Sequence, residues 1–170
     1  DTNQSENANE IKNPVHLSPN FNCGGILNYL ITSQTSIFNR LVVPSQSSGD
    51  IYSIIDKNDP GNYSSGSGEY EWIQFEFPEE IEFTSFTIQS AHRSFLKTWN
   101  IIGYDSNDEE VLLFEAKNDE SLNGKYNRIT KPFLKKFKTK KLRLEKFGEN
   151  WSTTNFFRIM HIDFFSDDPR

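Results

Sequence analysis

The chain has 170 residues, a formal net charge of −6 at pH 7 and a hydrophobic content of 35%. This length suits one domain with a sizeable core and excludes two domains of ordinary size. Aromatic residues make up 14% of the chain, with 15 Phe, 6 Tyr and 3 Trp, so we expect large rings to fill the core. The composition argues against disorder away from the chain ends.

The cysteine count bears on location. The single cysteine, Cys23, cannot form a disulfide within the chain, whereas secreted domains of this size often contain at least one. A cytoplasmic location is therefore favoured. Three glycosylation sequons, which begin at Asn3, Asn62 and Asn150, suit an extracellular location, and this alternative stays open.

Membrane and targeting signals are not visible in the sequence. No apolar run approaches the roughly 18 residues that a membrane-spanning helix needs. Residues 1–6 lack the apolar core of a signal peptide. The chain begins without methionine, which leaves a longer parent protein and a removed leader both open. We expect the chain to be one part of a larger multidomain protein.

The first third of the chain is the least regular. Residues 1–20 are polar and contain two prolines, which predicts a flexible linker or arm before a domain that spans residues 21–168. Ile26, Leu27 and Leu30 fall on one helical face and predict a short helix over residues 24–30. Apolar runs between polar turns over residues 41–55 predict strands.

From residue 71 onward, apolar and polar residues alternate in short runs of regular spacing. Such runs predict an all-β antiparallel sandwich with little helix. The apolar alternation slips by one residue at Thr84 and Ser85, which indicates a β-bulge. The predicted strands cover residues 72–77, 81–89, 98–104, 111–116, 140–147 and 156–165, with a turn at 123–124.

The three tryptophans fall in two kinds of context. Trp72 and Trp99 open runs with period-two alternation, so we predict that both belong to the core. Trp151 lies in a polar loop over residues 148–154, where an aromatic ring is a candidate for ligand or partner contact. Packing over the open end of the sandwich is the equal alternative.

Taken in order, these motifs resemble the coagulation factor V/VIII type C domain, also called discoidin-like or galactose-binding-like. The resemblance rests on Trp-Ile-x-Phe-x-Phe at 72–77, on Leu-Lys-x-Trp-x-Ile-x-Gly at 96–103 and on Ile-Asp-Phe-Phe at 162–165. It covers roughly residues 24–166 and is closest to intracellular, disulfide-free members. It implies an eight-stranded jelly roll of two sheets that acts as a binding module through loops at one end.

The resemblance also implies a calcium site. Residues 56–64 are similar to the family's Asp-Gly-Asn loop, in which oxygen ligands hold calcium together with an acidic residue of the last strand. Asp56, Asp59 and Asp163 occupy those positions here, and carboxylates are the ligands that calcium prefers. Lys57 departs from the pattern because the family has glycine there. A solvated acidic turn is the alternative.

A second candidate site is a ligand-binding group in the loops. Glycan-binding relatives often use a His and an Arg from such loops, and His92 and Arg93 follow the strand that ends near residue 89. Imidazole and guanidinium groups share hydrogen bonds with sugar hydroxyls, while a ring such as that of Tyr63 or Trp151 stacks on the sugar. Solvated loop residues are the alternative interpretation.

A third candidate is a basic stripe. Residues 131–146 contain eight Lys or Arg residues against one Glu, a net charge of +7 in a chain of −6. Such a stripe suits acidic lipid or nucleic acid, although lysines also keep edge strands soluble. The residues proposed for the patch are Lys135, Lys136, Lys138, Lys140, Lys141 and Arg143.

Catalysis is not expected, because the sequence shows no zinc pattern, phosphate loop or nucleophile elbow. The predicted function is recognition of a protein or other macromolecular partner through the end loops. Lectin-like carbohydrate binding with a structural calcium ion is the alternative. Binding of acidic lipid or nucleic acid through the stripe is a third hypothesis, with nucleic acid the weaker of its two ligands.

Overall fold

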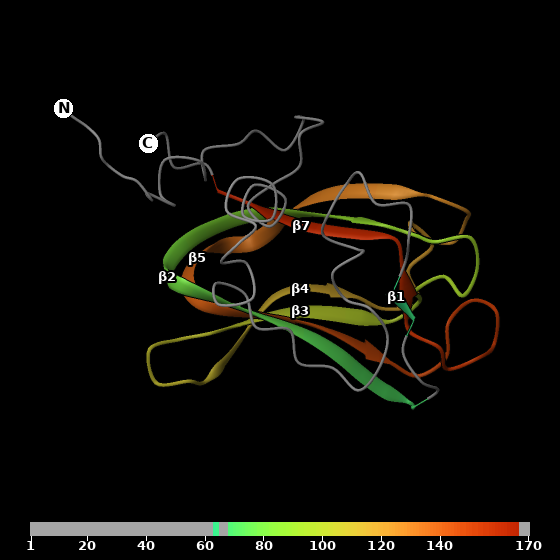
Figure 1. The fold of residues 1–170 in the computed structure, drawn as a ribbon, viewed down its shortest axis with the longest axis horizontal. Coiled ribbons are helices and arrows are strands. Elements are labelled where there is room, and N and C mark those ends of the chain that lie inside the picture. Colours follow the sequence, from blue (N-terminus) through green and yellow to red (C-terminus); the bar gives the residue numbers. More distant parts are fainter. Residues whose placement is uncertain (1–62, 65–67, 167–170) are drawn as a thin grey trace.

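A computed structural model describes residues 63–64 and 68–166, and in this part the chain forms seven strands and no helix (Figure 1). The all-β prediction is confirmed. The predicted arm, the short helix at 24–30 and the strands before residue 63 lie outside the described residues. The strands are β1 (Tyr63–Ser64), β2 (Tyr70–Gln89), β3 (Trp99–Tyr104), β4 (Glu110–Ala116), β5 (Arg128–Phe147), β6 (Arg158–Ile159) and β7 (His161–Phe165).

The strands form one large antiparallel sheet and one small one. The large sheet has the order β4-β3-β5-β2-β7, and β1 pairs with β6 beside it. β2 and β5 have 20 residues each, and both curve round one end of the molecule (Figure 1). The same two strands therefore contribute to both layers of the sandwich.

The curvature coincides with two irregularities in the β2–β5 pairing. The first falls between Glu76 and Ile81, and the second between Phe83 and Ser85. The second is the irregularity predicted at Thr84 and Ser85, so this prediction is confirmed. Bulges bend strands and increase their twist, which explains how β2 and β5 pass from one layer to the other.

Aromatic rings fill the space between the layers. Phe75 in the first half of β2 meets Phe164 of β7 with ring centroids 5.7 Å apart. Phe86 in the second half of β2 meets Trp99 of β3 at 5.9 Å. All four side chains are fully buried, and burial of aromatic area is the largest favourable contribution that single residues make to folding.

The two tryptophans at strand entries differ in position. Trp99 is fully buried in the core, as predicted. The prediction for Trp72 is wrong, because its neighbour Ile73 points into the core and alternation places Trp72 on the outer face of the sheet. There the guanidinium of Arg143 lies 4.0 Å from the centroid of its ring, so this ring packs against a cation rather than in the core.

Candidate functional site

Three loops meet at one end of the sandwich, on the right of Figure 1: residues 90–98, 117–127 and 148–157. Backbone hydrogen bonds join them. The N–H of Trp151 donates to the carbonyl of Phe95 at 2.9 Å, and the N–H of Asp119 donates to Lys97 at 2.9 Å. The predicted ligand-binding residues of two of these loops, His92, Arg93 and Trp151, thus share one end of the molecule.

Trp151 supports this end from within. Its indole Nε1–H donates to the carbonyl of Asp119 at 2.9 Å, and the ammonium of Lys97 lies 4.7 Å from its ring centroid. The side chain is partly buried. The backbone N–H, the indole N–H and the ring face toward Lys97 are all engaged by other parts of the protein. These contacts favour the interpretation that Trp151 packs over the end of the sandwich, rather than contacting a ligand directly.

The turn that presents Trp151 is organised by a buried asparagine. Asn150 is 1% exposed, and its Oδ1 accepts the N–H of Ser152 at 2.8 Å and of Thr154 at 3.2 Å. Its Nδ2 donates to the carbonyl of Phe156 at 3.0 Å. This loop is therefore preorganised rather than left to order upon binding.

Arg93, which follows His92 in the chain, lies close to a cation that the sequence pattern did not indicate, Arg158. β6, which contains Arg158, is held beside the end of β2 because the N–H of Met160 donates to the carbonyl of Gln89 at 2.9 Å. Burial lowers the pKa of the Arg158 guanidinium, and the charge of Arg93 lowers it further. The two guanidinium groups therefore lie near enough to repel each other.

The backbone of Tyr63 lies in the same region. It pairs with Ile159, and Ser64 pairs with Arg158 in the small β1–β6 sheet. The signal for Arg158 was present in the sequence as a single charge within the apolar run at 156–160. Arg158 falls within the last predicted strand, residues 156–165, and a single charge in a strand does not by itself indicate a site.

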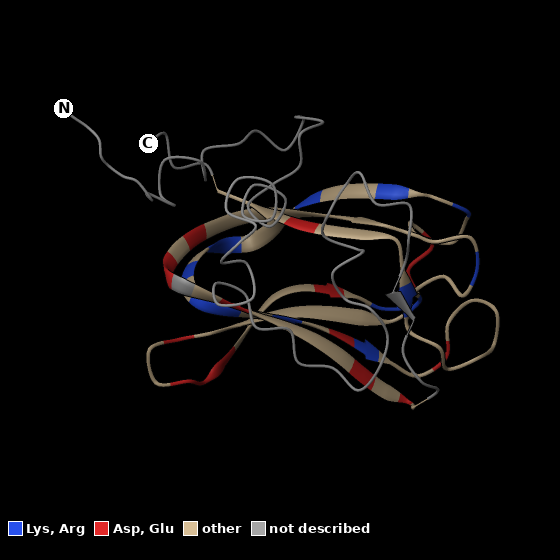
Figure 2. Cartoon of the chain, viewed as in Figure 1, with Lys and Arg blue, Asp and Glu red and all other residues tan. Residues whose placement is uncertain are grey.

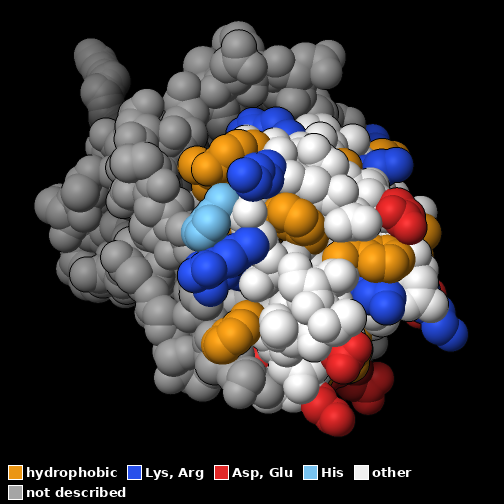
Figure 3. Space-filling view, turned by 90° about the vertical axis from the view of Figure 1, so that its right-hand side faces the viewer, with side chains coloured by type: hydrophobic (Ala, Val, Ile, Leu, Met, Phe, Trp, Pro, Cys, Tyr) orange, Lys and Arg blue, Asp and Glu red, His pale blue; other side chains and the backbone are white. Residues whose placement is uncertain are grey.

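The surface of this end combines cationic and apolar groups. Figure 3 shows a histidine side chain between cationic side chains of Lys or Arg, with hydrophobic side chains interspersed. Arg93 is exposed, Phe156 is 39% exposed and Tyr126 is 51% exposed. Guanidinium and imidazole donors next to open aromatic rings suit a ligand with many hydroxyl groups.

The predicted calcium ligands are only partly within the described residues. Asp163 is fully buried in β7, and its Oδ1 accepts the backbone N–H of Phe164 at 2.8 Å. Asp56 and Asp59 lie outside the described residues. Between residues 68 and 166, no three His, Cys, Asp or Glu side chains are grouped to hold a metal ion. The calcium site stays a prediction.

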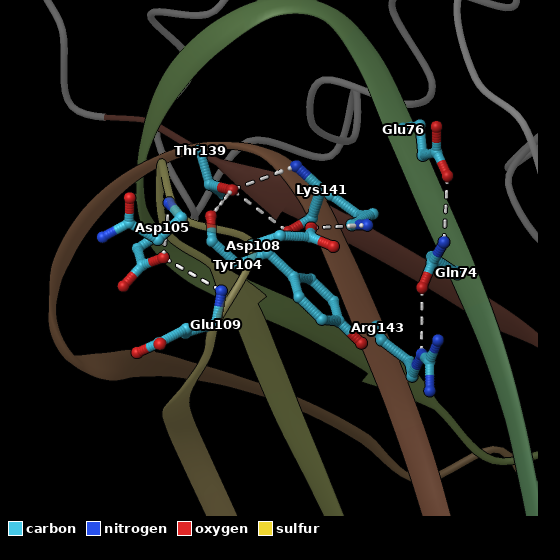
Figure 4. Close-up of polar contacts among 10 residues, drawn as sticks. Gln74, Glu76, Tyr104, Asp105, Asp108, Glu109, Thr139, Lys141 and Arg143 are labelled. Carbon is cyan, nitrogen blue, oxygen red and sulfur yellow. Dashed lines mark hydrogen bonds and ion pairs between the residues drawn. The ribbon is translucent and has the colours of Figure 1, made fainter.

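The basic stripe divides between two environments. Lys135, Lys136, Lys138 and Lys140 are exposed. By contrast, Lys141 forms an ion pair of 2.9 Å with Asp108, and Arg143 donates to Gln74 at 3.0 Å (Figure 4).

Acidic residues of β2 accompany the exposed lysines. Lys138 lies opposite Glu82 in the β2–β5 register, and basic and acidic segments alternate around the bend (Figure 2). The local charge is therefore more mixed than the sequence of β5 suggests. Binding of acidic lipid or nucleic acid stays a prediction.

Known proteins are similar to this chain in structure but not detectably in sequence. No protein-family model and no curated protein sequence matches the chain. In the described part, no helix has the length and apolar character to cross a membrane. Solved structures, by contrast, are similar over most of the chain.

Three of these structures are carbohydrate-binding modules. CpGH89CBM32-5 from Clostridium perfringens, in complex with GalNAc-β-1,3-galactose, has a TM-score of 0.59 at 13% identity and covers 74% of this chain and 95% of its own. The family 32 module of C. perfringens NanJ, in complex with galactose, has a TM-score of 0.57 at 15% identity, and the match covers 72% of this chain and 92% of the module. The family 32 module of Streptococcus pneumoniae EndoD has a TM-score of 0.56 at 13% identity, and the match covers 74% of this chain and 94% of the module.

The chain has the fold of the family 32 carbohydrate-binding modules. This is the discoidin-like, galactose-binding-like jelly roll that the sequence resemblance implied, so that prediction is confirmed. At identities of 13–15% the likeness shows the fold and leaves the ligand to be argued from the site.

Proposed function

We propose that this chain is a non-enzymatic carbohydrate-binding module that holds a sugar at the loop end of the sandwich. The observation that carries the proposal is the grouping of His92, Arg93 and Arg158 there, on a fold shared with solved carbohydrate-binding modules. This combination favours carbohydrate over the protein partner that the sequence placed first.

The chemistry of the face supports a polyhydroxylated ligand. The guanidinium of Arg93 presents several fixed N–H donors to adjacent hydroxyl oxygens, and the imidazole of His92 adds a donor or an acceptor. The exposed rings of Phe156 and Tyr126 are available to the apolar face of a sugar ring. Because Asn150 and Trp151 already fix the loops, little ordering is required on binding.

Isothermal titration with galactose and with GalNAc-β-1,3-galactose tests the proposal. We expect saturable binding to the full chain, and Arg93→Ala should weaken it by about tenfold or more, because a charge-assisted hydrogen bond is lost. His92→Ala should weaken it in the same direction.

Lys136→Ala is the matched control, because it removes an exposed cation from the middle of β5 instead of the loop end. It should bind like the unaltered chain, and thermal unfolding should confirm that every variant is folded. Failure of a broad glycan panel to bind the unaltered chain, or undiminished binding by Arg93→Ala, would count against a sugar site at this face.

A further inference from the structure

A pocket of about 440 Å³ opens at the other end of the molecule, away from the three loops. It forms where β2 leaves its register with β5 after Glu76, and where the β3–β4 turn over residues 105–109 closes against them. Its volume falls within the range of small-molecule sites, roughly 300–1,000 Å³. The function proposed above makes no use of this pocket.

The walls of the pocket are fixed by internal hydrogen bonds (Figure 4). Asp105 Oδ1 accepts the backbone N–H of Asn107 at 2.8 Å and of Glu109 at 2.9 Å. The Thr139 hydroxyl donates to the carbonyl of Tyr104 at 2.6 Å. The part of the wall that Asp105 and Thr139 form is therefore already in place before a ligand binds, which lowers the cost of ordering on binding.

The lining is negatively charged overall. Four carboxylates, those of Glu76, Glu80, Asp105 and Asp108, accompany only two ammonium groups, those of Lys140 and Lys141. Lys141 is already paired with Asp108 at 2.9 Å, which leaves three carboxylates against one lysine. The charge of the remaining lining favours a cation.

A metal ion does not fit this lining. Within the part of the chain that the structure describes, the carboxylates of this pocket do not converge into a group of three that suits a metal. Calcium needs six to eight oxygen ligands within about 2.6 Å. Negative charge that is spread around a pocket of molecular size suits an organic cation instead.

Lys141 provides an internal example of the chemistry. Its ammonium group lies 2.9 Å from the Asp108 carboxylate and 4.3 Å from the centroid of the Tyr104 ring. An alkylammonium group is thus held between a carboxylate and an aromatic face at the edge of the pocket. Glu80, another lining residue, is exposed and makes no hydrogen bond or ion pair within the described residues.

We propose that this pocket binds a small organic cation that bears a primary ammonium group, with Glu80 and Asp105 as its carboxylate partners. The buried edges of Phe77 and Tyr104 provide the apolar part of the wall. Glu76 contributes further charge, although one of its oxygens accepts the Gln74 amide at 3.0 Å. This site is separate from the sugar site at the loop end.

Amide chemical shifts of the full chain test the proposal, with glucosamine as the probe and N-acetylglucosamine as its neutral counterpart. We expect saturable shifts at the amides of residues 104–110 with glucosamine, and about tenfold weaker or absent binding with N-acetylglucosamine, which lacks the charge. n-Butylamine, which bears the ammonium group without hydroxyl groups, should shift the same amides.

Two variants identify the carboxylates. Glu80→Gln and Asp105→Asn should each weaken glucosamine binding by about threefold to tenfold, and Asn still offers an oxygen to the N–H groups of the turn. Glu115→Gln, an exposed change on β4, is the matched control and should have no effect. Equal shifts with N-acetylglucosamine, or no shift with either amine, would overturn the proposal.

The two sites can be separated by exchanging their variants. Glu80→Gln should leave galactose binding unchanged, and Arg93→Ala should leave the glucosamine shifts unchanged. If Arg93→Ala instead removes the glucosamine shifts, the amine is held at the loop end and the pocket proposal is wrong, whereas the carbohydrate proposal is unaffected.

Discussion

Lys146 shows how the sandwich accommodates a buried charge. Its side chain is 1% exposed, and its ammonium donates to the carbonyls of Gly68, Glu69 and Gly148 at 3.1, 3.3 and 2.7 Å. Burial lowers the pKa of Lys146, and the nearby Glu71 and Glu69 oppose this shift. This lysine of the basic stripe joins the start of β2 to the end of β5 and contributes nothing to a surface patch.

Tyr70, on the outer face of the same two strands, predicts how stability depends on alkaline pH. Burial, and then the hydrogen bond to Glu145 at 2.7 Å, raise the pKa of Tyr70 from 10.0 to about 12. The folded state therefore retains the phenol proton after the unfolded state has lost it. The stabilisation is complete below pH 10 and is lost as the pH rises from 10.0 toward about 12.

Urea unfolding across this pH range checks the prediction. The unaltered chain should lose more stability than Tyr70→Phe as the pH rises, because phenylalanine has no proton to release. Absorbance titration of the phenolates in the folded protein should show one late-titrating phenol fewer in Tyr70→Phe, while Tyr104, whose pKa burial also raises, still titrates late. Parallel loss of stability in both proteins would contradict the assignment to this residue.

Among the strands, the sequence predicted those with strict alternation and missed the first part of β5. Residues 72–77 and 81–89 fall within β2, and residues 98–104 and 111–116 match β3 and β4 within one residue. In β5 the inward positions Ile129, Phe133 and Phe137 recur every four residues. The second register irregularity interrupts the period of two there, so the pattern did not indicate a strand.

Gly103 of β3 predicts the cost of disturbing the contact with that part of β5. A Cβ atom at this position would lie 2.8 Å from Cε2 of Phe137 and 3.1 Å from Cδ1 of Leu113. Gly103→Ala should therefore destabilise the domain by about 1–3 kcal/mol, as overpacked cores do. Chemical denaturation measures this change in the free energy of unfolding.

Phe137→Leu serves as the test of mechanism, because it removes the ring that the new methyl group would meet. The double variant should lose less stability than the sum of the two single variants. Strict additivity would show that the alanine acts through another contact.

The candidate site is assembled from segments that are far apart in the sequence. His92 and Arg93 were predicted from their loop, and Trp151 from its polar surroundings. That the loops share one end follows from the strand order, which the sequence pattern alone does not provide. The hydrogen bonds of Trp151 go to the backbone carbonyls of Phe95 and Asp119, and no side-chain pattern encodes contacts with carbonyl groups.

Trp151→Ala should loosen this end as a unit. Loss of the partly buried ring and its hydrogen bond should cost about 2 kcal/mol, whereas Trp151→Phe, which keeps a ring, should cost about 1 kcal/mol. Hydrogen exchange should show faster opening at the amides of Trp151 and Asp119, both of which are hydrogen-bonded between loops. Unchanged stability and exchange in Trp151→Ala would contradict the supporting role.

The passage of β2 and β5 through both layers has a mechanical consequence. In a sandwich made from two separate sheets, a shearing force needs only to slide one apolar face over the other. Here the same two strands pair from Tyr70 opposite Phe147 to Gln89 opposite Arg128, with two irregularities between them. Force applied to one layer is therefore transmitted along the continuous backbone of β2 and β5 into the other layer. We expect the two layers to unfold together under force instead of sliding past each other.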